Sequence, residues 1–166
     1  MNNQTLAALL VIAALLALLI AWAIRQMLRG WAHRAVWQAG LIGTLPPLPD
    51  TVGDVMVPAT TGLYVGSTLA PSWQDRIAVA DLGFRSKAVL TRYREGIMLR
   101  RTGGDPIWIP QDSIMALRTE RALAGKVLTH DGIVVIRWRL PSGTEIDTGF
   151  RCDDRRDVAT WVEEDR

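Results

Sequence analysis

Basic side chains are concentrated between residues 85 and 101, where they can bind an anionic group. Six lysine or arginine residues stand in this stretch against one acid, Glu95. Guanidinium and ammonium groups bind phosphates and carboxylates through charge-assisted hydrogen bonds. The six candidate ligand-binding residues are Arg85, Lys87, Arg92, Arg94, Arg100 and Arg101.

Strand alternation divides this basic set. Successive side chains of a strand point to opposite faces, and Arg92 and Arg94 share a parity that Arg85 and Lys87 do not. Unless a bulge intervenes, the two pairs therefore face opposite sides of the sheet. Scattered, solvated charge is the alternative interpretation of the cluster.

The sequence contains no pattern typical of a catalytic or metal site. His130 and Asp131 are adjacent, but no third group or nucleophile accompanies them. His33 has no cysteine, histidine or carboxylate at ligand spacing. Cys152 is the only cysteine, so it cannot form an internal disulfide, and no activating base is identifiable. We therefore expect a protein that is not an enzyme and needs no metal or cofactor.

Three other charged segments have two interpretations each. In 73–76 (WQDR) and 81–85 (DLGFR), an Asp–Arg pair can hold an anion, or the residues can organise a loop and a corner of a barrel. The second interpretation assigns Gly83 a φ that other residues avoid. The third segment, 118–121 (RTER), is either an interaction edge or a solvated cluster.

The element that fixes the location of the protein is an apolar run near the N-terminus. Leu6 to Ile24 contains 19 residues without a charge. At about 1.5 Å per residue, a helix of this length spans roughly the hydrocarbon core of a bilayer. A cleaved signal sequence ending near Ala21-Trp22-Ala23 is the alternative, although no Lys or Arg precedes the run. We expect residues 1–24 to form a transmembrane helix.

The charges after this run predict its orientation. Arg25, Arg29 and Arg34 follow it, and no acid occurs before Asp50. By the positive-inside rule, the N-terminus lies outside the cell membrane and the rest of the chain is cytoplasmic. Indole rings tend to lie at membrane interfaces. The residues expected at the membrane surface are Trp22, Arg25, Arg29, Trp31 and Arg34.

The positive charge of the chain does not indicate nucleic-acid binding. From Asp50 onward, 16 basic residues are opposed by 17 acidic ones. The excess of positive charge therefore belongs to the segment beside the membrane, and the C-terminal domain has no basic footprint for a nucleic acid.

Composition divides the rest of the chain into a connector and one small domain. Residues 25–50 are expected to continue the helix to a stop at Gly40, followed by a proline-rich linker at 43–50. Residues 51–166 are expected to form a mainly β domain of about seven to nine short strands. The candidates for these strands are ten segments: Val52–Val57, Gly62–Leu69, Arg76–Val79, Phe84–Arg94, Ile97–Arg101, Ile107–Ile109, Ser113–Glu120, Lys126–Thr129, Ile133–Leu140 and Glu145–Arg151.

Two patterns place the core of this domain. Within 133–140, Val134, Ile136, Trp138 and Leu140 alternate with a second set that ends in two arginines, so the first set should face the core. Near the C-terminus, apolar residues at 158, 161 and 162 form one stripe of a short helix, with Asp153 or Asp154 as its cap.

These features, with the segments 73–86 (WQDRIAVADLGFRS), 120–126 (ERALAGK), 137–140 (RWRL) and 144–151 (TEIDTGFR), resemble a known family. It comprises actinobacterial single-pass membrane proteins with a PH-like domain, often encoded beside pyrimidine-biosynthesis genes and loosely described as transporters or export proteins. The resemblance implies an N-terminal helix, a PH-like β-barrel of two packed sheets and a capping C-terminal helix. It implies no catalytic mechanism and no set of binding residues.

The sequence thus favours a membrane-anchored module that docks a protein partner at the cytoplasmic face, with strand addition as one mechanism. A sensor of anionic lipid headgroups or of a small anionic ligand is the alternative. A third function, as accessory subunit of a transport assembly, would require the helix to oligomerise, because one helix cannot line a solute path.

Overall fold

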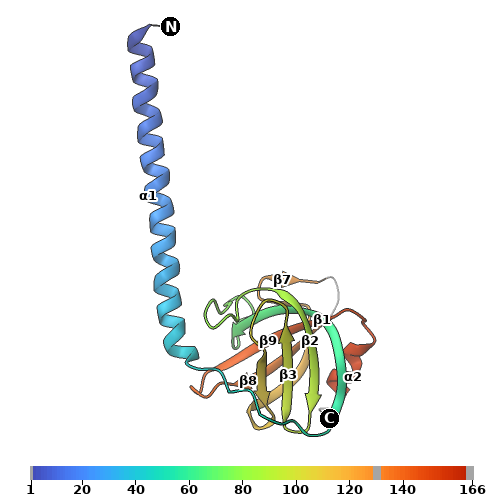
Figure 1. The fold of residues 1–166 in the computed structure, drawn as a ribbon. Helices are drawn as coiled ribbons and strands as arrows, with labels where there is room; N and C mark the ends of the chain where they lie inside the picture. The colour runs from blue at the N-terminus through green and yellow to red at the C-terminus, as the bar shows by residue number, and fades with distance from the viewer. Residues whose placement is uncertain (1, 129–131, 164–166) are drawn as a thin grey trace. The chain divides into compact units, whose positions relative to one another are not determined.

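The computed structural model describes residues 2–128 and 132–163, except for the side chains of residues 3, 31–35 and 163. It divides into two compact units, Met1–Trp37 and Gln38–Arg166. The helices and strands are labelled in Figure 1, where the first unit is helical and the second is mainly β.

Helix α1 (Asn3–Ile42) contains the apolar N-terminal segment. Within it, the segment Gln4–Gly30 contains an 18-residue stretch with a mean hydropathy of 2.9, and none of this stretch is buried. A helix that is apolar all round is stable in lipid, because it satisfies its own backbone hydrogen bonds and exposes no polar face. A signal sequence near the N-terminus would share this length and composition.

Helix α1 ends later than the sequence predicts. Gly40 was the expected stop signal, but it lies inside the helix, which continues to Ile42. Gly43 follows with φ of 62°, the left-handed conformation that glycine adopts at helix ends. The carbonyl of Leu41 accepts hydrogen bonds from the hydroxyls of Ser142 (2.6 Å) and Thr144 (2.7 Å). These distant hydroxyls satisfy a helix-end carbonyl that has no partner within the helix.

The last residues of α1 are part of the second unit. The Gln38 side chain donates to the carbonyl of Arg76 (3.1 Å) and accepts from the amide of Ala78 (2.8 Å). Ile42 is fully buried in the main core, and Leu45 packs against it. The compact unit thus begins at Gln38, ahead of the proline-rich segment that marks the predicted boundary at residue 51.

One antiparallel sheet forms most of the second unit, with strand order β4-β3-β2-β1-β9-β8-β5. The hairpin β6–β7 forms a separate small sheet. The strands and short helices are β1 (Val55–Leu69), β2 (Ser86–Tyr93), β3 (Gly96–Arg101), β4 (Ile107–Pro110), η1 (Gln111–Ser113), β5 (Ile114–Glu120), β6 (Ala122–Leu123), β7 (Lys126–Val127), β8 (Ile133–Arg139), β9 (Glu145–Cys152) and α2 (Asp157–Glu163).

Strand β1 connects the two halves of the sheet. Its first part pairs with β2 and its second part with β9, and a bulge lies between Tyr64 and Gly66. Gly66 has φ of 134°, which side-chain-bearing residues rarely adopt. The sequence predicted two separate strands here, 52–57 and 62–69. The bulges instead bend one continuous strand.

Two local predictions around the hairpins were wrong. The expected strand 76–79 is a loop with a single bridge, between Thr68 and Arg76. Strand β6 was not predicted, and it pairs with β7 through Ala122 and Val127. Thr129, which the sequence assigns to the second of these strands, lies outside the described residues, as does His130.

The alternation in β8 correctly predicts the main core. Val134, Ile136 and Trp138 are fully buried there, together with Leu140. The opposite face is not wholly in water, however, because the β6–β7 hairpin region covers part of it. A second buried cluster lies on that side, formed by Val65, Leu123, Ala124, Ile133 and Val135.

Helix α2 contributes Trp161 to the main core. The indole is fully buried and donates to the hydroxyl of Thr60 (3.1 Å). The helix begins at Asp157, later than the predicted cap at Asp153 or Asp154. Asp154 instead accepts the amide of Arg156 (2.9 Å) in the turn before the helix. Figure 1 shows α2 beside β1 at one end of the sheet.

Candidate functional site

The structure does not bring the six predicted basic residues to one surface. Arg101 is 8% exposed and donates two hydrogen bonds to the carbonyl of Asp105 (2.9 and 2.8 Å) and one to that of Asp81. Its guanidinium also lies over the rings of Tyr64 (5.2 Å) and Phe84 (5.3 Å). Arg101 therefore joins two loops to the core, which leaves little of it to bind a ligand.

Three more of the six lie apart from one another. Arg92 is buried on the core face of β2, on the side opposite Lys87, as the alternation indicates. Arg94 is exposed in the β2–β3 turn, 3.6 Å from the carboxylate of Asp54. Arg85 is exposed in the chain before β2.

The remaining two, Lys87 and Arg100, line a groove together with Arg151, which the sequence analysis did not select. The groove has a volume of about 500 Å³. Leu63 of β1 pairs with Lys87 on one side and with Arg151 on the other. Directly paired residues of an antiparallel sheet lie on the same face. Lys87, Leu63 and Arg151 therefore form one row across three strands.

A second row completes the groove. Val89 of β2 pairs with Thr61 of β1 and with Arg100 of β3. Asp153 lies at the end of this row, where its amide donates to the carbonyl of Thr61 (3.0 Å). Asp153 and Thr102 also line the groove. Arg101 is in the lining as well, so the groove has an apolar floor, four basic residues and one carboxylate.

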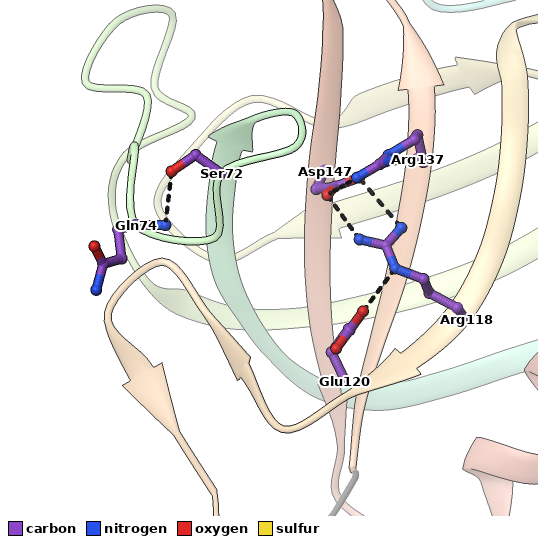
Figure 2. Close-up of polar contacts among 6 residues, drawn as sticks. All are labelled: Ser72, Gln74, Arg118, Glu120, Arg137 and Asp147. Atoms are coloured by element: carbon purple, nitrogen blue, oxygen red, sulfur yellow. Dashed lines mark hydrogen bonds and ion pairs between the residues drawn. The ribbon is translucent and has the colours of Figure 1, made fainter.

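A second charged region lies on the same face of the sheet, over β5, β8 and β9 (Figure 2). Asp147, 1% exposed, accepts hydrogen bonds from two guanidinium groups. Arg137 approaches it through Nε (2.9 Å) and Nη2 (2.8 Å), and Arg118 through Nη1 (3.3 Å) and Nη2 (2.7 Å). Nε of Arg118 also donates to Glu120 (2.9 Å). We call these four residues the Asp147 network.

The Asp147 network neutralises its own charge. Burial by itself raises the pKa of Asp147, but the hydrogen bonds from Arg137 and Arg118 lower it below the ordinary value of a carboxyl group. Burial lowers the pKa of Arg118, and its bonds to Asp147 and Glu120 raise it overall. Two arginines and two carboxylates leave no net charge. This arrangement stabilises the ionised forms of Asp147, Arg118 and Arg137.

Sequence reasoning placed only part of this network. It correctly expected Arg137 to face away from the main core, and it left Arg118 as part of a solvated cluster or an interaction edge. The direct pairing of Arg137 with Asp147 explains why the carboxylate is buried between arginines. One sequence signal pointed to this position of Asp147. Along β9, Glu145 and Asp147 alternate with Ile146 and Thr148, which places the two carboxylates on one face of the strand.

Arg76 organises a loop, which agrees with one of the two interpretations of segment 73–76. Its guanidinium donates to the carbonyls of Gly83 (2.5 Å), Val65 (3.2 Å) and Ala124 (2.7 Å). Three backbone segments are thereby held together by one side chain. At the start of the loop, the Ser72 hydroxyl accepts the amide of Gln74 at 3.4 Å (Figure 2).

The sequence analysis assigned Gly83 a φ that other residues avoid, and the structure gives a different reason for a glycine at this position. Gly83 has no positive φ, and the left-handed residues of this loop are Ala80 (54°) and Asp81 (57°). A Cβ at Gly83 would lie 2.6 Å from the carbonyl oxygen of Ile77. Glycine is required there because the backbone of residues 77 and 78 passes too close for any side chain.

Tyr64 and Cys152, two buried side chains that could serve as nucleophiles, are not activated for that role. Burial raises the pKa of Tyr64 to about 12, and its hydroxyl lies within hydrogen-bond distance of Ser67 (2.9 Å) and of the carbonyl of Leu82 (2.7 Å). Burial also raises the pKa of Cys152 to about 12, with Asp157 adding to the shift. A thiol with this pKa is a poor nucleophile at neutral pH. Within the described residues, no group of three His, Cys, Asp or Glu side chains is placed to hold a metal ion.

The residues expected at the membrane surface lie on α1. Trp22, Arg25 and Arg29 are exposed there. The side chains of Trp31 and Arg34 are outside the described part of the structure, as is that of His33.

Comparison with known protein families identifies the second unit. Residues 42–166 match the family described as Bacterial PH domain-like. The chain belongs to this family. The expected fold is thereby confirmed: a mainly β, PH-like domain with one N-terminal apolar helix and a short C-terminal helix. The sheet of this PH-like domain is sandwich-like and does not close into a barrel.

No curated protein matches the chain. PH-like domains are generally non-enzymatic. The PH-like domain, preceded by a helix long and apolar enough to cross a membrane, suggests a membrane-anchored interaction module.

Proposed function

We propose that this protein is an uncleaved, single-pass membrane protein whose PH-like domain docks a protein partner at the cytoplasmic face of the cell membrane. The observation that carries the proposal is the direct continuation of the apolar helix into the domain. Only seven residues, 31–37, separate Gly30, the end of the apolar segment, from Gln38, the start of the domain. At no more than about 3.5 Å per residue, this connection is short enough to hold the domain near the membrane.

The orientation rests on the charges that follow the apolar segment. Arg25, Arg29 and Arg34 have no acidic counterpart before Asp50, and such segments remain on the cytoplasmic side. The lone thiol is a poor reporter of this orientation, because Cys152 is 6% exposed and its pKa is raised by burial. A topology experiment therefore needs a cysteine at an exposed position.

Two single substitutions test the anchor and its orientation in intact cells. Asn2→Cys and Gln111→Cys each place a thiol at an exposed site. A membrane-impermeant maleimide should label the first in intact cells and the second only after permeabilisation, with the unsubstituted chain as the unlabelled control. Labelling of Gln111→Cys in intact cells, or loss of residues 1–24 from the mature protein by mass spectrometry, would contradict the proposal.

The first part of β1 is the docking edge that we propose. Strand β9 pairs with β1 only from Gly62 onward, and the amide of Asp153 donates to the carbonyl of Thr61, so no strand within the described residues pairs with the β9 side of residues 55–60. Val55 and Met56 are 54% and 45% exposed there. Pro58 lies in the same stretch, and proline within sheets is confined to edges and bulges. A partner can add a strand to such an edge through main-chain hydrogen bonds.

A matched pair of valines tests this edge. Val55 in β1 and Val127 in β7 are both exposed strand residues, at 54% and 64%. A photo-crosslinking amino acid at position 55 of the full chain should give one discrete adduct with a protein in the native membrane. The same group at position 127 should not. Absence of an adduct from position 55, or an identical adduct from both, would contradict docking at this edge.

A further inference from the structure

The groove between β9, β1, β2 and β3 is lined by basic side chains. Within the described residues, Lys87, Arg100 and Arg151 form no ion pair. Arg101 also lines the groove but is bonded to backbone carbonyls, and Asp153 is the only carboxylate in the lining, so the lining carries a net charge of about +3. Like charges held on neighbouring strands repel each other, so the cluster does not contribute to folding by itself.

The geometry of the three cations suits a phosphate. Arg100 is on β3, the strand next to that of Lys87, and belongs to the adjacent row of paired residues. Arg151 is in the same row as Lys87, with Leu63 between them. Long side chains from these positions can converge on one group above the apolar floor. Guanidinium groups bind phosphate oxygens bidentately, and a lysine ammonium adds a point charge. The hydroxyls of Thr61 and Thr102, also in the lining, can donate further hydrogen bonds.

The volume indicates how much of a ligand the groove admits. At about 500 Å³, it is within the range of ordinary small-molecule sites, which is roughly 300–1,000 Å³. A single phosphate is much smaller than this space. The apolar side chains of Leu63 and Val89 can contact the remainder of a phosphorylated molecule.

We propose that this groove is a binding site for a phosphate-bearing anion, held by Lys87, Arg100 and Arg151 over the floor formed by Leu63 and Val89. The phosphate belongs either to a soluble molecule or to a lipid headgroup. The negative charge of a phosphate would offset part of the positive charge of the groove. The site does not depend on the orientation or on the docking edge proposed above.

The chain contains its own reporter and control for this site. Lys87 and Lys126 are its only two lysines, and Lys126 lies in β7, outside the groove. The full chain, held in phosphatidylcholine nanodiscs, is acetylated with and without inorganic pyrophosphate, and the rate at each lysine is followed by mass spectrometry. At a concentration ten times its dissociation constant, pyrophosphate should slow acetylation of Lys87 about tenfold and leave Lys126 unchanged.

A second arm distinguishes the two sources of phosphate. Nanodiscs that contain phosphatidylglycerol, without pyrophosphate, should protect Lys87 if the source is the membrane. Protection by pyrophosphate alone assigns the groove to a soluble ligand. Arg100→Gln and Arg151→Gln should each abolish the protection, whereas Arg139→Gln, an exposed arginine paired with Glu145, should retain it. An unchanged melting temperature of each variant excludes unfolding as the cause.

Equal acetylation of Lys87 under all three conditions would overturn the proposal. Protection that persists in Arg100→Gln and Arg151→Gln would overturn it as well. Protection of Lys87 in native membranes that neither phosphate source reproduces would assign the groove to a protein partner, and would likewise exclude the site proposed here.

Discussion

Two regions on one face of the sheet differ in how their basic residues are paired. In the Asp147 network, each arginine has a carboxylate within hydrogen-bond distance. In the groove, Lys87, Arg100 and Arg151 form no ion pair within the described chain, and Asp153 is the one carboxylate of the lining. Strand β9 contributes to both regions, with Asp147 in the first and Arg151 in the second.

The difference separates charge that the fold requires from charge that it does not. The buried charges of the Asp147 network have a structural role, because each paired group stabilises the ionised form of its partner. Unpaired charges around a hollow need another explanation, and binding of an anion supplies one. Leu123 of the β6–β7 hairpin covers Gly149, between the two regions of β9, where a Cβ would lie 2.4 Å from its side chain.

Removal of the shared carboxylate should have the largest effect. Asp147→Asn leaves two arginines without their buried anion, and breaking such a pair destabilises proteins by about 3–5 kcal/mol. We expect the melting temperature of the PH-like domain, measured in the full chain in detergent, to fall by roughly 10 °C. The control is Glu145→Gln at the exposed pair with Arg139, where a loss below about 1 kcal/mol is expected. An equal fall of the melting temperature in Asp147→Asn and Glu145→Gln would contradict a special structural role of the Asp147 network.

Acid should destabilise the domain through the same carboxylate. The pKa of Asp147 is lowered in the folded state, so its contribution is complete above the unfolded value of about 4 and is lost as the pH falls further. Unfolding temperatures measured between neutral and acidic pH should therefore decline below about pH 4. This decline should be shallower in Asp147→Asn. An identical pH profile in the two proteins would show that other carboxylates dominate.

Substitutions in the groove should have the smallest effect on stability. Lys87→Gln and Arg100→Gln remove exposed, unpaired charges, and we expect each to change the free energy of unfolding by less than about 0.5 kcal/mol. Urea denaturation of the full chain in detergent measures this. A loss above about 2 kcal/mol would mean that the groove residues support the fold, and the comparison between the two regions would no longer hold.

Sequence alone predicted the elements whose patterns are local. The apolar helix, the core face of β8 and the apolar stripe of the C-terminal helix that includes Trp161 each follow from the pattern of residues within one segment. The alternation within β2 also separated Arg92 from Lys87. Such patterns depend only on residues a few positions apart, so they are visible without the fold.

The features that sequence reasoning missed depend on pairing between distant strands. Arg151 joins the groove because β9 pairs with β1 beside Leu63, and no local pattern near residue 151 indicates this. Arg101 was counted as a ligand because its burial depends on loops at residues 81 and 105. Register between strands far apart in the sequence therefore decided which basic residues share a surface.

The burial of Gln38 and Ile42 has a practical consequence for preparing the domain without its membrane segment. A fragment cut at the proline-rich segment, beginning at residue 51, would lack the Gln38 hydrogen bonds and the Ile42 side chain. Truncating a buried isoleucine commonly costs about 2–5 kcal/mol, a large share of the stability of a small domain. Soluble fragments should therefore start before Gln38, and those that start later are expected to aggregate or to unfold.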